Sequence, residues 1–311
     1  MKKSNMAVSR LIKNRIRATK NIKQITRAME AVSAVKMRKS QAAALQARPY
    51  ALAALEVLKN IRSAAGHDVA QLHPLMIERT TGLTCFVVIT SDKGLAGSFN
   101  SNVIRQAAKL IREAKEAVEI IAVGKKGRDF FKRRGFNVVE FTGFGDFADV
   151  SETKPVAEKI LALYPKYKEV ILIYTNFISA LRQEVSVHSI LPFKKESLIE
   201  IVEGIIPLRG KYSGMPQALQ IDIPKAEYIF EPDPQKLLNT LLPKLLEIEV
   251  HHAILEGNAS EHSARMVSMR SASQNAGELM DKLTISYNKA RQAQITKELT
   301  EITAGREALN A

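Results

Sequence analysis

The first 48 residues of this 311-residue chain contain neither proline nor glycine, the residues that most often end a helix. Small or apolar side chains recur there at helical spacing, with Arg15 and Lys36 as interruptions. The series is Val8, Leu11, Ala18, Ile22, Ile25, Met29 and Val32. Such spacing is typical of a helix that packs along its length against another helix. The sequence therefore predicts a long helix over residues 1–62.

The C-terminal end repeats this pattern over residues 226–311. No proline follows Pro243, and small or apolar residues recur at Met266, Met269, Ser273, Ala276, Met280, Leu283, Tyr287, Ala290 and Gln294. Two seams of similar length at opposite ends of a chain can bury each other, so we expect a long antiparallel two-helix coiled coil. Small residues bury little apolar area, which leaves two readings open: an ordinary helical hairpin, or a shaft stabilised by an enclosing partner.

The middle of the chain alternates strand and helix patterns. Strands are predicted at 83–90, 118–123, 137–141, 170–174 and, at a sheet edge, 184–190. Helices are predicted near 99–116, 125–134 and 153–164, the second of them basic. This alternation indicates a Rossmann-like doubly wound α/β domain, which we place at 83–225. Within it, residues 197–225 give no clear pattern.

The positive charge lies mainly at the N-terminus. The net charge is +14, and residues 1–48 carry 13 basic side chains against one acid, Glu30. An anionic partner is therefore expected. Residues 1–49 hold no aromatic side chain that could stack on bases, so a nucleic-acid-binding coiled-coil protein is only the alternative. The apolar pattern continues past residue 30 without a cleavage signal, which favours a mature cytoplasmic start over a transit peptide.

Several local patterns suggest enzyme chemistry, but each is weak. Residues 143–148 formally match GxGxxA, yet they follow the third predicted strand and no helix opens on them. The loop at 91–100 lacks the three-glycine fingerprint and is read as a tight turn rather than a ligand site. His251 and His252 are adjacent on a helix, so they cannot converge on one metal ion and are expected to be partly exposed. Cys85 lies in a predicted buried strand without an activating His.

We therefore expect no catalytic, cofactor or metal site, and a dinucleotide-binding enzyme remains an alternative. No P-loop motif occurs, so ATP has no binding route of that kind. No apolar stretch approaches the roughly 20 residues that a membrane-spanning helix needs.

Six segments resemble the gamma subunit of rotary F-type ATP synthases. They are ITRAME at 25–30, KMRKSQ at 36–41, SDKGLAGSFN at 91–100, EPD at 231–233, ASEHSARM at 259–266 and YNKARQAQIT at 287–296. These motifs follow the family order over nearly the whole chain. Ala96, Ser98 and Phe99 depart from the Cys, Gly and Leu of many members, and the cysteine-bearing regulatory insert of chloroplast members is absent.

The resemblance implies a non-catalytic rotor in the central stalk. In that family the coil lies inside a ring of alternating alpha and beta subunits. The α/β domain binds the epsilon subunit and the ring of c subunits at the cytoplasmic face of the bacterial membrane. Its rotation couples proton flow to ATP synthesis in the hexamer.

The same resemblance suggests the residues at the rotating interface. Arg291, Gln292, Thr296 and Glu298 match the segment that engages a loop of a beta subunit, and Met29 matches a position near acidic beta loops. Lys36, Arg38 and Lys39 are expected to face acidic groups, with a solvated helix face as the alternative. The tail, which includes Ile295, Leu299, Ile302 and Leu309, is read as an apolar tip in a bearing; alternatively it packs on its own partner helix.

Overall fold

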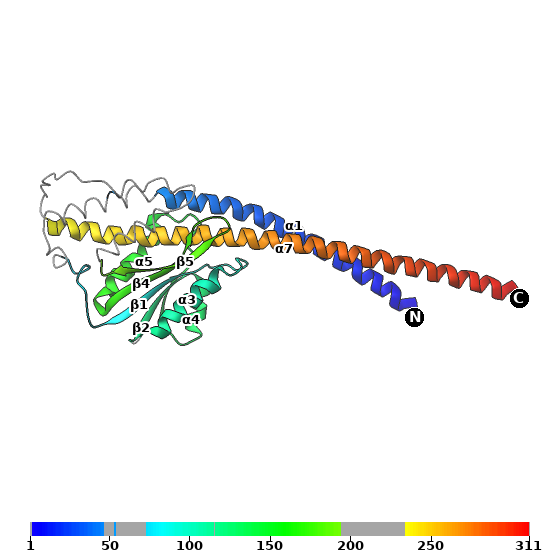
Figure 1. Cartoon of the computed structure of the whole chain (residues 1–311), viewed down its shortest axis with the longest axis horizontal. Helices are drawn as coiled ribbons and strands as arrows, with labels where there is room; N and C mark the ends of the chain where they lie inside the picture. The colour runs from blue at the N-terminus through cyan, green and yellow to red at the C-terminus, as the bar shows by residue number, and fades with distance from the viewer. Residues whose placement is uncertain (1, 47–52, 54–72, 115, 194–233, 311) are drawn as a thin grey trace. The chain divides into compact units, whose positions relative to one another are not determined.

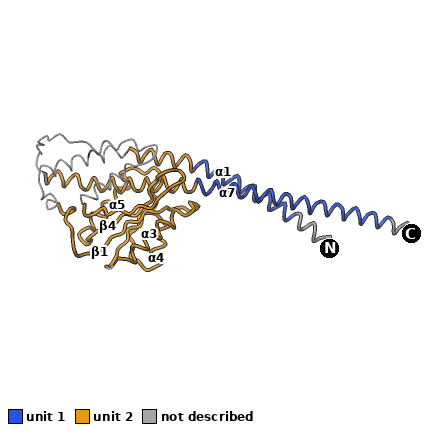
Figure 2. Tube along the Cα trace, in the orientation of Figure 1, with its two compact units in different colours: residues 1–32, 266–311 blue, residues 33–265 orange. Residues whose placement is uncertain are grey.

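The computed structural model describes residues 2–46, 53, 73–114, 116–193 and 234–310, without the side chains of 2–9, 234 and 307–310. The chain divides into two compact units (Figure 2). Unit 1 contains residues 1–32 and 266–311, and unit 2 contains residues 33–265. Both ends of the chain therefore belong to the same unit.

Two long helices run through these units (Figure 1). Helix α1 spans Lys2–Gln46, and helix α7 spans Pro234–Asn310 with a proline at its first position, where the missing N–H costs nothing. In unit 1 they lie side by side in opposite directions (Figure 2). The predicted antiparallel helix pair is confirmed. Residues 62 and 226, the inner limits of the predicted helices, lie outside the described residues.

A five-stranded sheet forms the centre of unit 2. Its strands are β1 (Leu83–Ile89), β2 (Val118–Val123), β3 (Val138–Phe141), β4 (Tyr167–Phe177) and β5 (Gln183–Leu191), in the spatial order β3-β2-β1-β4-β5. The pairs β1–β2, β1–β4 and β2–β3 are parallel, and β4–β5 is antiparallel. The strand order reverses direction beside β1, as it does in Rossmann-like sheets. The fifth strand lies at an edge, as predicted.

Helices cover both faces of this sheet because the residues of each strand alternate between two cores. On one face Phe86 and Val88 pack with helices α3 (Phe99–Glu113) and α4 (Lys125–Lys132). On the other face Val87 and Ile121 pack with α5 (Val150–Leu163) and the first part of α7. These residues are buried almost completely. The doubly wound architecture is confirmed, with α3 ending at Glu113 rather than near residue 116.

Candidate functional site

The seam that α7 presents in unit 1 is the predicted one. Met269, Ser273 and Ala276 are buried, and Met266, Met280, Leu283, Tyr287, Ala290 and Gln294 are partly buried. The α7 residues between these positions, which lie on other sides of the helix, are mostly exposed. The heptad spacing of α7 therefore located its packed face correctly.

The seam predicted for α1 is wrong. Leu11, Ile22, Ile25 and Val32 are between 53% and 59% exposed. The side of α1 that is buried instead carries small or polar residues at seven-residue spacing. They are Thr19 and Thr26 in unit 1, followed by Ser33 and Ser40 in unit 2. The prediction assumed that the most apolar side of a helix packs within its own chain, and here the packed side lies about 100° around the helix from it.

Short side chains explain why a polar side of α1 can be buried. The hydroxyl of Thr26 donates to the carbonyl oxygen of Ile22 at 2.9 Å, so it needs no partner on the opposite helix. Small residues also let helices approach closely. Gly277 in α7 shows this approach, because a Cβ atom there would lie 3.0 Å from Nζ of Lys23. Nearby, Nε of Arg270 donates to Glu30 at 3.0 Å.

Unit 1 therefore leaves most of its large apolar side chains in contact with solvent. Besides the four residues of α1, α7 exposes Leu279, Ile285, Ile295, Leu299 and Ile302, by 48% to 68%. Ile295, Leu299 and Ile302 follow one another at spacings of four and three and so share a helix face. Apolar surface repeated in this way along two helices is typical of a protein–protein interface.

The residues predicted to engage a beta subunit are exposed on α7. Arg291, Gln292, Thr296 and Glu298 lie within about 160° of the helix circumference at 100° per residue. The partly buried seam residues Ala290 and Gln294 lie outside that arc. Inside the chain, Glu298 accepts a hydrogen bond from Nε2 of Gln294 at 3.0 Å. The four residues thus lie on a different side of α7 from the seam residues Ala290 and Gln294.

The predicted residues of α1 occupy different environments. Met29 is partly buried in unit 1, whereas Arg38 and Lys39 are exposed in unit 2. Nζ of Lys39 lies 5.7 Å from the ring centre of Phe147. Lys36 meets an acidic group of its own chain, because its Nζ donates to the carboxylate of Asp146 at 2.5 Å. The acidic partner expected for Lys36 is therefore already present in unit 2.

Asp146 joins three elements of unit 2. Its carboxylate binds Lys36 of α1 and lies 2.8 Å from Nε2 of His262 in α7. Its backbone carbonyl accepts hydrogen bonds from Ser40 of α1 at 2.9 Å and from Asn258 of α7 at 3.3 Å. This residue, in the loop between β3 and α5, thus holds both long helices through four polar contacts. We call Asp146 and these four partners the Asp146 cluster.

Arg265 fixes the tautomer of His262. Its Nη1 lies 3.1 Å from Nδ1 of His262, and a guanidinium can only donate, so Nδ1 accepts and Nε2 carries the proton toward Asp146. Burial lowers the pKa of His262, although the nearby Asp146 carboxylate acts to raise it. The lowered pKa keeps the ring neutral at neutral pH. Burial opposes the ionisation of Asp146, but the hydrogen bond from Lys36 and the nearby charges outweigh it and lower its pKa. Arg265 also forms an ion pair with Glu261 and donates to the carbonyl of Gly94.

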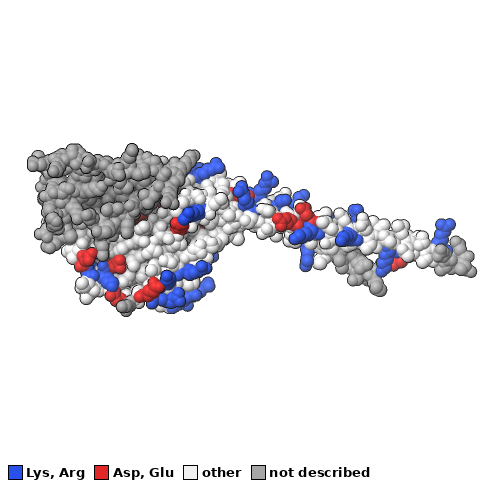
Figure 3. Space-filling view, in the orientation of Figure 1, with Lys and Arg blue, Asp and Glu red and all other residues white. Residues whose placement is uncertain are grey.

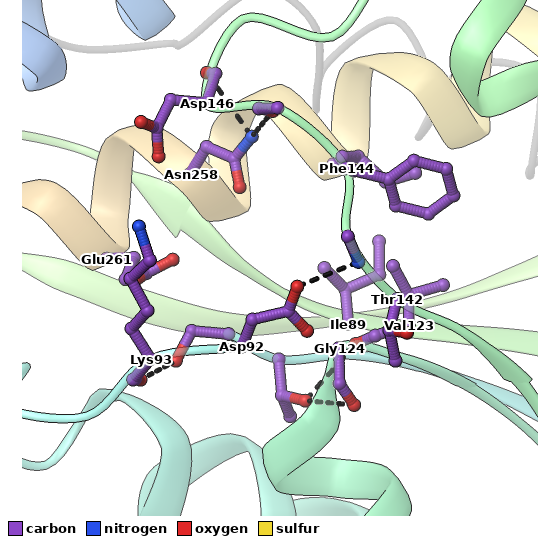
Figure 4. A pocket seen from close by; sticks show the side chains of 15 residues that line it. Ile89, Asp92, Lys93, Val123, Gly124, Thr142, Phe144, Asp146, Asn258 and Glu261 are labelled. Carbon is purple, nitrogen blue, oxygen red and sulfur yellow. Dashed lines mark hydrogen bonds between the residues drawn. The ribbon is translucent and has the colours of Figure 1, made fainter.

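A cavity of about 160 Å³ lies beside the Asp146 cluster, at the carboxyl ends of β1, β2 and β3 (Figure 4). Both loops discussed as enzyme motifs line it. The carboxylate of Asp92 accepts the backbone N–H of Gly143 at 2.8 Å and that of Lys125 at 2.9 Å. Lys125 begins α4, so the carboxylate of Asp92 occupies the N-terminus of that helix, and its charge would repel a phosphate there.

Other candidate chemical groups serve packing. His251 and His252 are buried, not partly exposed as expected, and Nδ1 of His251 lies 3.0 Å from the hydroxyl of Thr153 in α5. Burial raises the pKa of the Cys85 thiol to about 12, which keeps it protonated at neutral pH.

In the part of the chain that the structure describes, no three His, Cys, Asp or Glu side chains are arranged to hold a metal ion. The described helices also include none that is long and apolar enough to cross a membrane.

The buried polar residues are not indicated by apolar periodicity. Thr19, Thr26, Ser33 and Ser40 recur every seven residues in the sequence, but none of them is apolar. The contact between Asp146 and His262 joins residues 116 positions apart and has no local signal.

Comparisons with known proteins agree with this architecture. A family model described as "ATP synthase" matches residues 9–309. The ATP synthase gamma chain of Moorella thermoacetica is 40% identical over 307 residues, which cover 98% of this chain and 100% of the relative. The gamma chain of Pelotomaculum thermopropionicum is 40% identical over 301 residues, or 96% of this chain and 98% of the relative.

Solved structures show the same fold. A chain of the OSCP/F1/c-ring structure of Euglena gracilis mitochondrial ATP synthase aligns with a TM-score of 0.61 at 18% identity, over 97% of this chain and 95% of that one. A chain of the central stalk/c-ring structure from Tetrahymena thermophila aligns with a TM-score of 0.58 at 24% identity, over 80% and 99%. Fold and sequence together define a subunit of a rotary ATP synthase. The chain belongs to the ATP synthase gamma chain family.

Proposed function

We propose that this chain is the central-stalk rotor of an F-type ATP synthase. It turns inside the hexamer of alpha and beta subunits and couples proton translocation to ATP synthesis. The observation that carries the proposal is unit 1, a helix pair in which α1 packs through small or polar residues and both helices leave large aliphatic side chains exposed. Such a pair gains stability when other subunits enclose it.

The chain itself performs no bond chemistry in this proposal. Its uneven faces favour a different conformation in each beta subunit, which requires contacts whose free energies differ between those conformations. Coupling of this kind is reciprocal, so rotation changes nucleotide affinity and hydrolysis can drive rotation backward. Residues 1–62 and 226–311 form the shaft, and residues 83–225 form the domain that binds the epsilon subunit and the c ring. The complex holds the chain at the cytoplasmic face of the bacterial membrane.

The interface residues follow from this arrangement. Arg291, Gln292, Thr296 and Glu298 contact a beta subunit through charge-assisted hydrogen bonds that break and reform at each step. Their exposure on one side of α7 supports this role. Met29, Arg38 and Lys39 face acidic loops of the hexamer, whereas Lys36 serves within the Asp146 cluster.

A rotation assay tests the proposal directly. In the assembled catalytic sector, Lys109→Cys on α3 places an exposed thiol on unit 2 for attachment of a bead. The native Cys85 is buried and protonated, so a chain without the substitution is the matched control for labelling. With the hexamer fixed to a surface, ATP should turn the bead in one direction, pausing once for each beta subunit.

A bead that stays still while the hexamer hydrolyses ATP would contradict the proposal. So would ATP hydrolysis by the purified chain alone.

A further inference from the structure

A groove of about 790 Å³ lies between α3 and α4, on the face of the sheet opposite α5. Its floor is apolar and includes Ile104, Ala108, Phe130 and Phe136. All four are partly exposed, so the groove is open to a partner. Unit 2 contains every residue that lines it.

The rim of this α3–α4 groove is strongly basic. Figure 3 shows Lys and Arg gathered on the surface over α3 and α4. The lining carries five cations, Arg105, Arg112, Lys126, Arg133 and Arg134, against a single acid, Asp129. Lys126 belongs to α4, and Arg133 and Arg134 directly follow the end of that helix.

Little within the chain neutralises this charge. Asp129 is already bound by Arg128 at 2.8 Å. Arg134 lies over the ring of Phe130, with its guanidinium carbon 3.5 Å from the ring centre. Among the described residues, no carboxylate lies within ion-pair distance of Arg105, Arg112 or Arg133. A basic rim around an apolar floor is complementary to a ligand that has one apolar side and one acidic side.

We propose that the α3–α4 groove binds an acidic amphipathic helix of a partner protein. Asn100 and Arg112 mark its limits along α3, and the twelve residue steps between them, at about 1.5 Å each, give about 18 Å, a little over three helical turns. A helix of that length lays three or four apolar side chains on the floor and directs its carboxylates to the rim. The two proposals rest on different observations: this one on the groove in unit 2, and the rotor function on the exposed helix pair of unit 1.

A binding assay with the purified full-length chain tests it. The probe is a fluorescent 14-residue peptide that forms a helix with Leu on one face and Glu on the other. A second peptide of the same composition, scrambled to remove the apolar face, isolates the contribution of the floor. We expect the amphipathic peptide to bind at least about tenfold more tightly than the scrambled one, with affinity that falls as salt rises.

Variants of the chain locate the site. Arg105→Glu/Arg133→Glu should weaken binding at least about tenfold, because both rim charges reverse. The matched control, Lys109→Glu on α3 with Lys125→Glu on α4, makes the same change in net charge at residues that do not line the groove, and should alter affinity less than about twofold. Ala108→Glu places a carboxylate on the floor and should also abolish binding. Circular dichroism verifies that each variant keeps its helical content.

Three results would overturn the proposal. The first is equal binding of the two peptides, which would indicate only a diffuse polyanion surface. The second is equal loss in the rim variant and in its control. The third is tighter binding of phosphatidylglycerol vesicles, polyphosphate or duplex DNA at the groove than of the amphipathic peptide, which would assign the surface to a different class of ligand.

Discussion

The two units of this chain treat their apolar residues in opposite ways. Unit 2 encloses a sheet whose central residues, such as Val87 and Ile121, are completely buried. In the described part of unit 1 the only buried apolar side chains are Met269 and Ala276, which are 5% and 7% exposed, while Ile22 and Leu299 are more than half exposed. Unit 2 is therefore stabilised by its own core, and unit 1 depends much more on what surrounds it.

The largest expected effect compares one isoleucine from each unit. Ile121→Ala removes a fully buried side chain from β2 and should lower the free energy of unfolding by about 2–5 kcal/mol. Ile22→Ala removes an exposed side chain and should change it by less than about 0.5 kcal/mol. Urea denaturation of the purified full-length chain measures both.

In the assembled complex, by contrast, the exposed isoleucines of unit 1 should matter for binding. Ile22→Ala/Ile25→Ala should weaken association with alpha and beta subunits although the isolated chain keeps its stability. Similar unfolding losses for Ile121→Ala and Ile22→Ala would mean that unit 1 has an independent core, and the comparison would fail.

The second prediction concerns the Asp146 cluster, whose polar contacts hold α1 and α7 in unit 2, whereas in unit 1 the two helices meet along their seam. Asp146→Asn removes the charge that Lys36 and His262 face and should cost about 1–3 kcal/mol at pH 7. Asp281→Asn, at an exposed position of α7, is the matched control and should cost less than about 0.5 kcal/mol.

The pH dependence identifies the charge as the cause. The pKa of Asp146 is lowered in the folded chain, so its contribution is complete above about pH 4, its value when unfolded. The contribution is lost as pH falls through the lower folded value. The difference between wild type and Asp146→Asn should therefore be constant from pH 6 to 8 and shrink below about pH 4. A difference that persisted in acid would assign the loss to packing.

The third prediction tests whether unit 1 faces acidic groups of other subunits. Met29→Lys should reduce ATP synthesis by the assembled complex about fivefold, because an added ion pair of about 1 kcal/mol would favour one rotational state. Assembly should be unaffected, since Met29 is only partly buried. Met29→Leu keeps the size without the charge and should behave as wild type. Normal coupling in the Lys variant would remove Met29 from the rotating interface.

The comparison also explains what could be predicted from the sequence. Continuous β-branched runs such as 83–89 predicted the strands of unit 2 because a sheet covered on both faces buries every residue of its central strands. The seam of α7 was predicted for a similar reason, since its packed side is also its more apolar side. For α1 the packed side is not the more apolar side. Both sides repeat every seven residues, and periodicity alone does not say which of them packs against α7.

The candidate site was less predictable than the fold. Arg291 and Glu298 were found through family resemblance, and their exposure on one side of α7 supports that reading. Asp146 was seen only as part of a glycine-containing loop. Its importance arises from the meeting of α1, α7 and the β3–α5 loop, which no short-range pattern encodes.

The smallest predicted effect comes from two buried glycines of α7, one in each unit. A Cβ atom at Gly277 in unit 1 would meet only the end of the Lys23 side chain, which can move away, so Gly277→Ala should stabilise the chain by about 0.5–1 kcal/mol through helix propensity. At Gly257 in unit 2 the same atom would lie 3.2 Å from Cγ2 of the packed Ile89, so Gly257→Ala should destabilise it by roughly 1 kcal/mol. Each variant serves as the control for the other, because the helix and the chemical change are the same. If urea denaturation showed that both substitutions destabilise, the seam of unit 1 would be packed as rigidly as the core of unit 2; if both stabilised, Ile89 would be able to move away from the added methyl group.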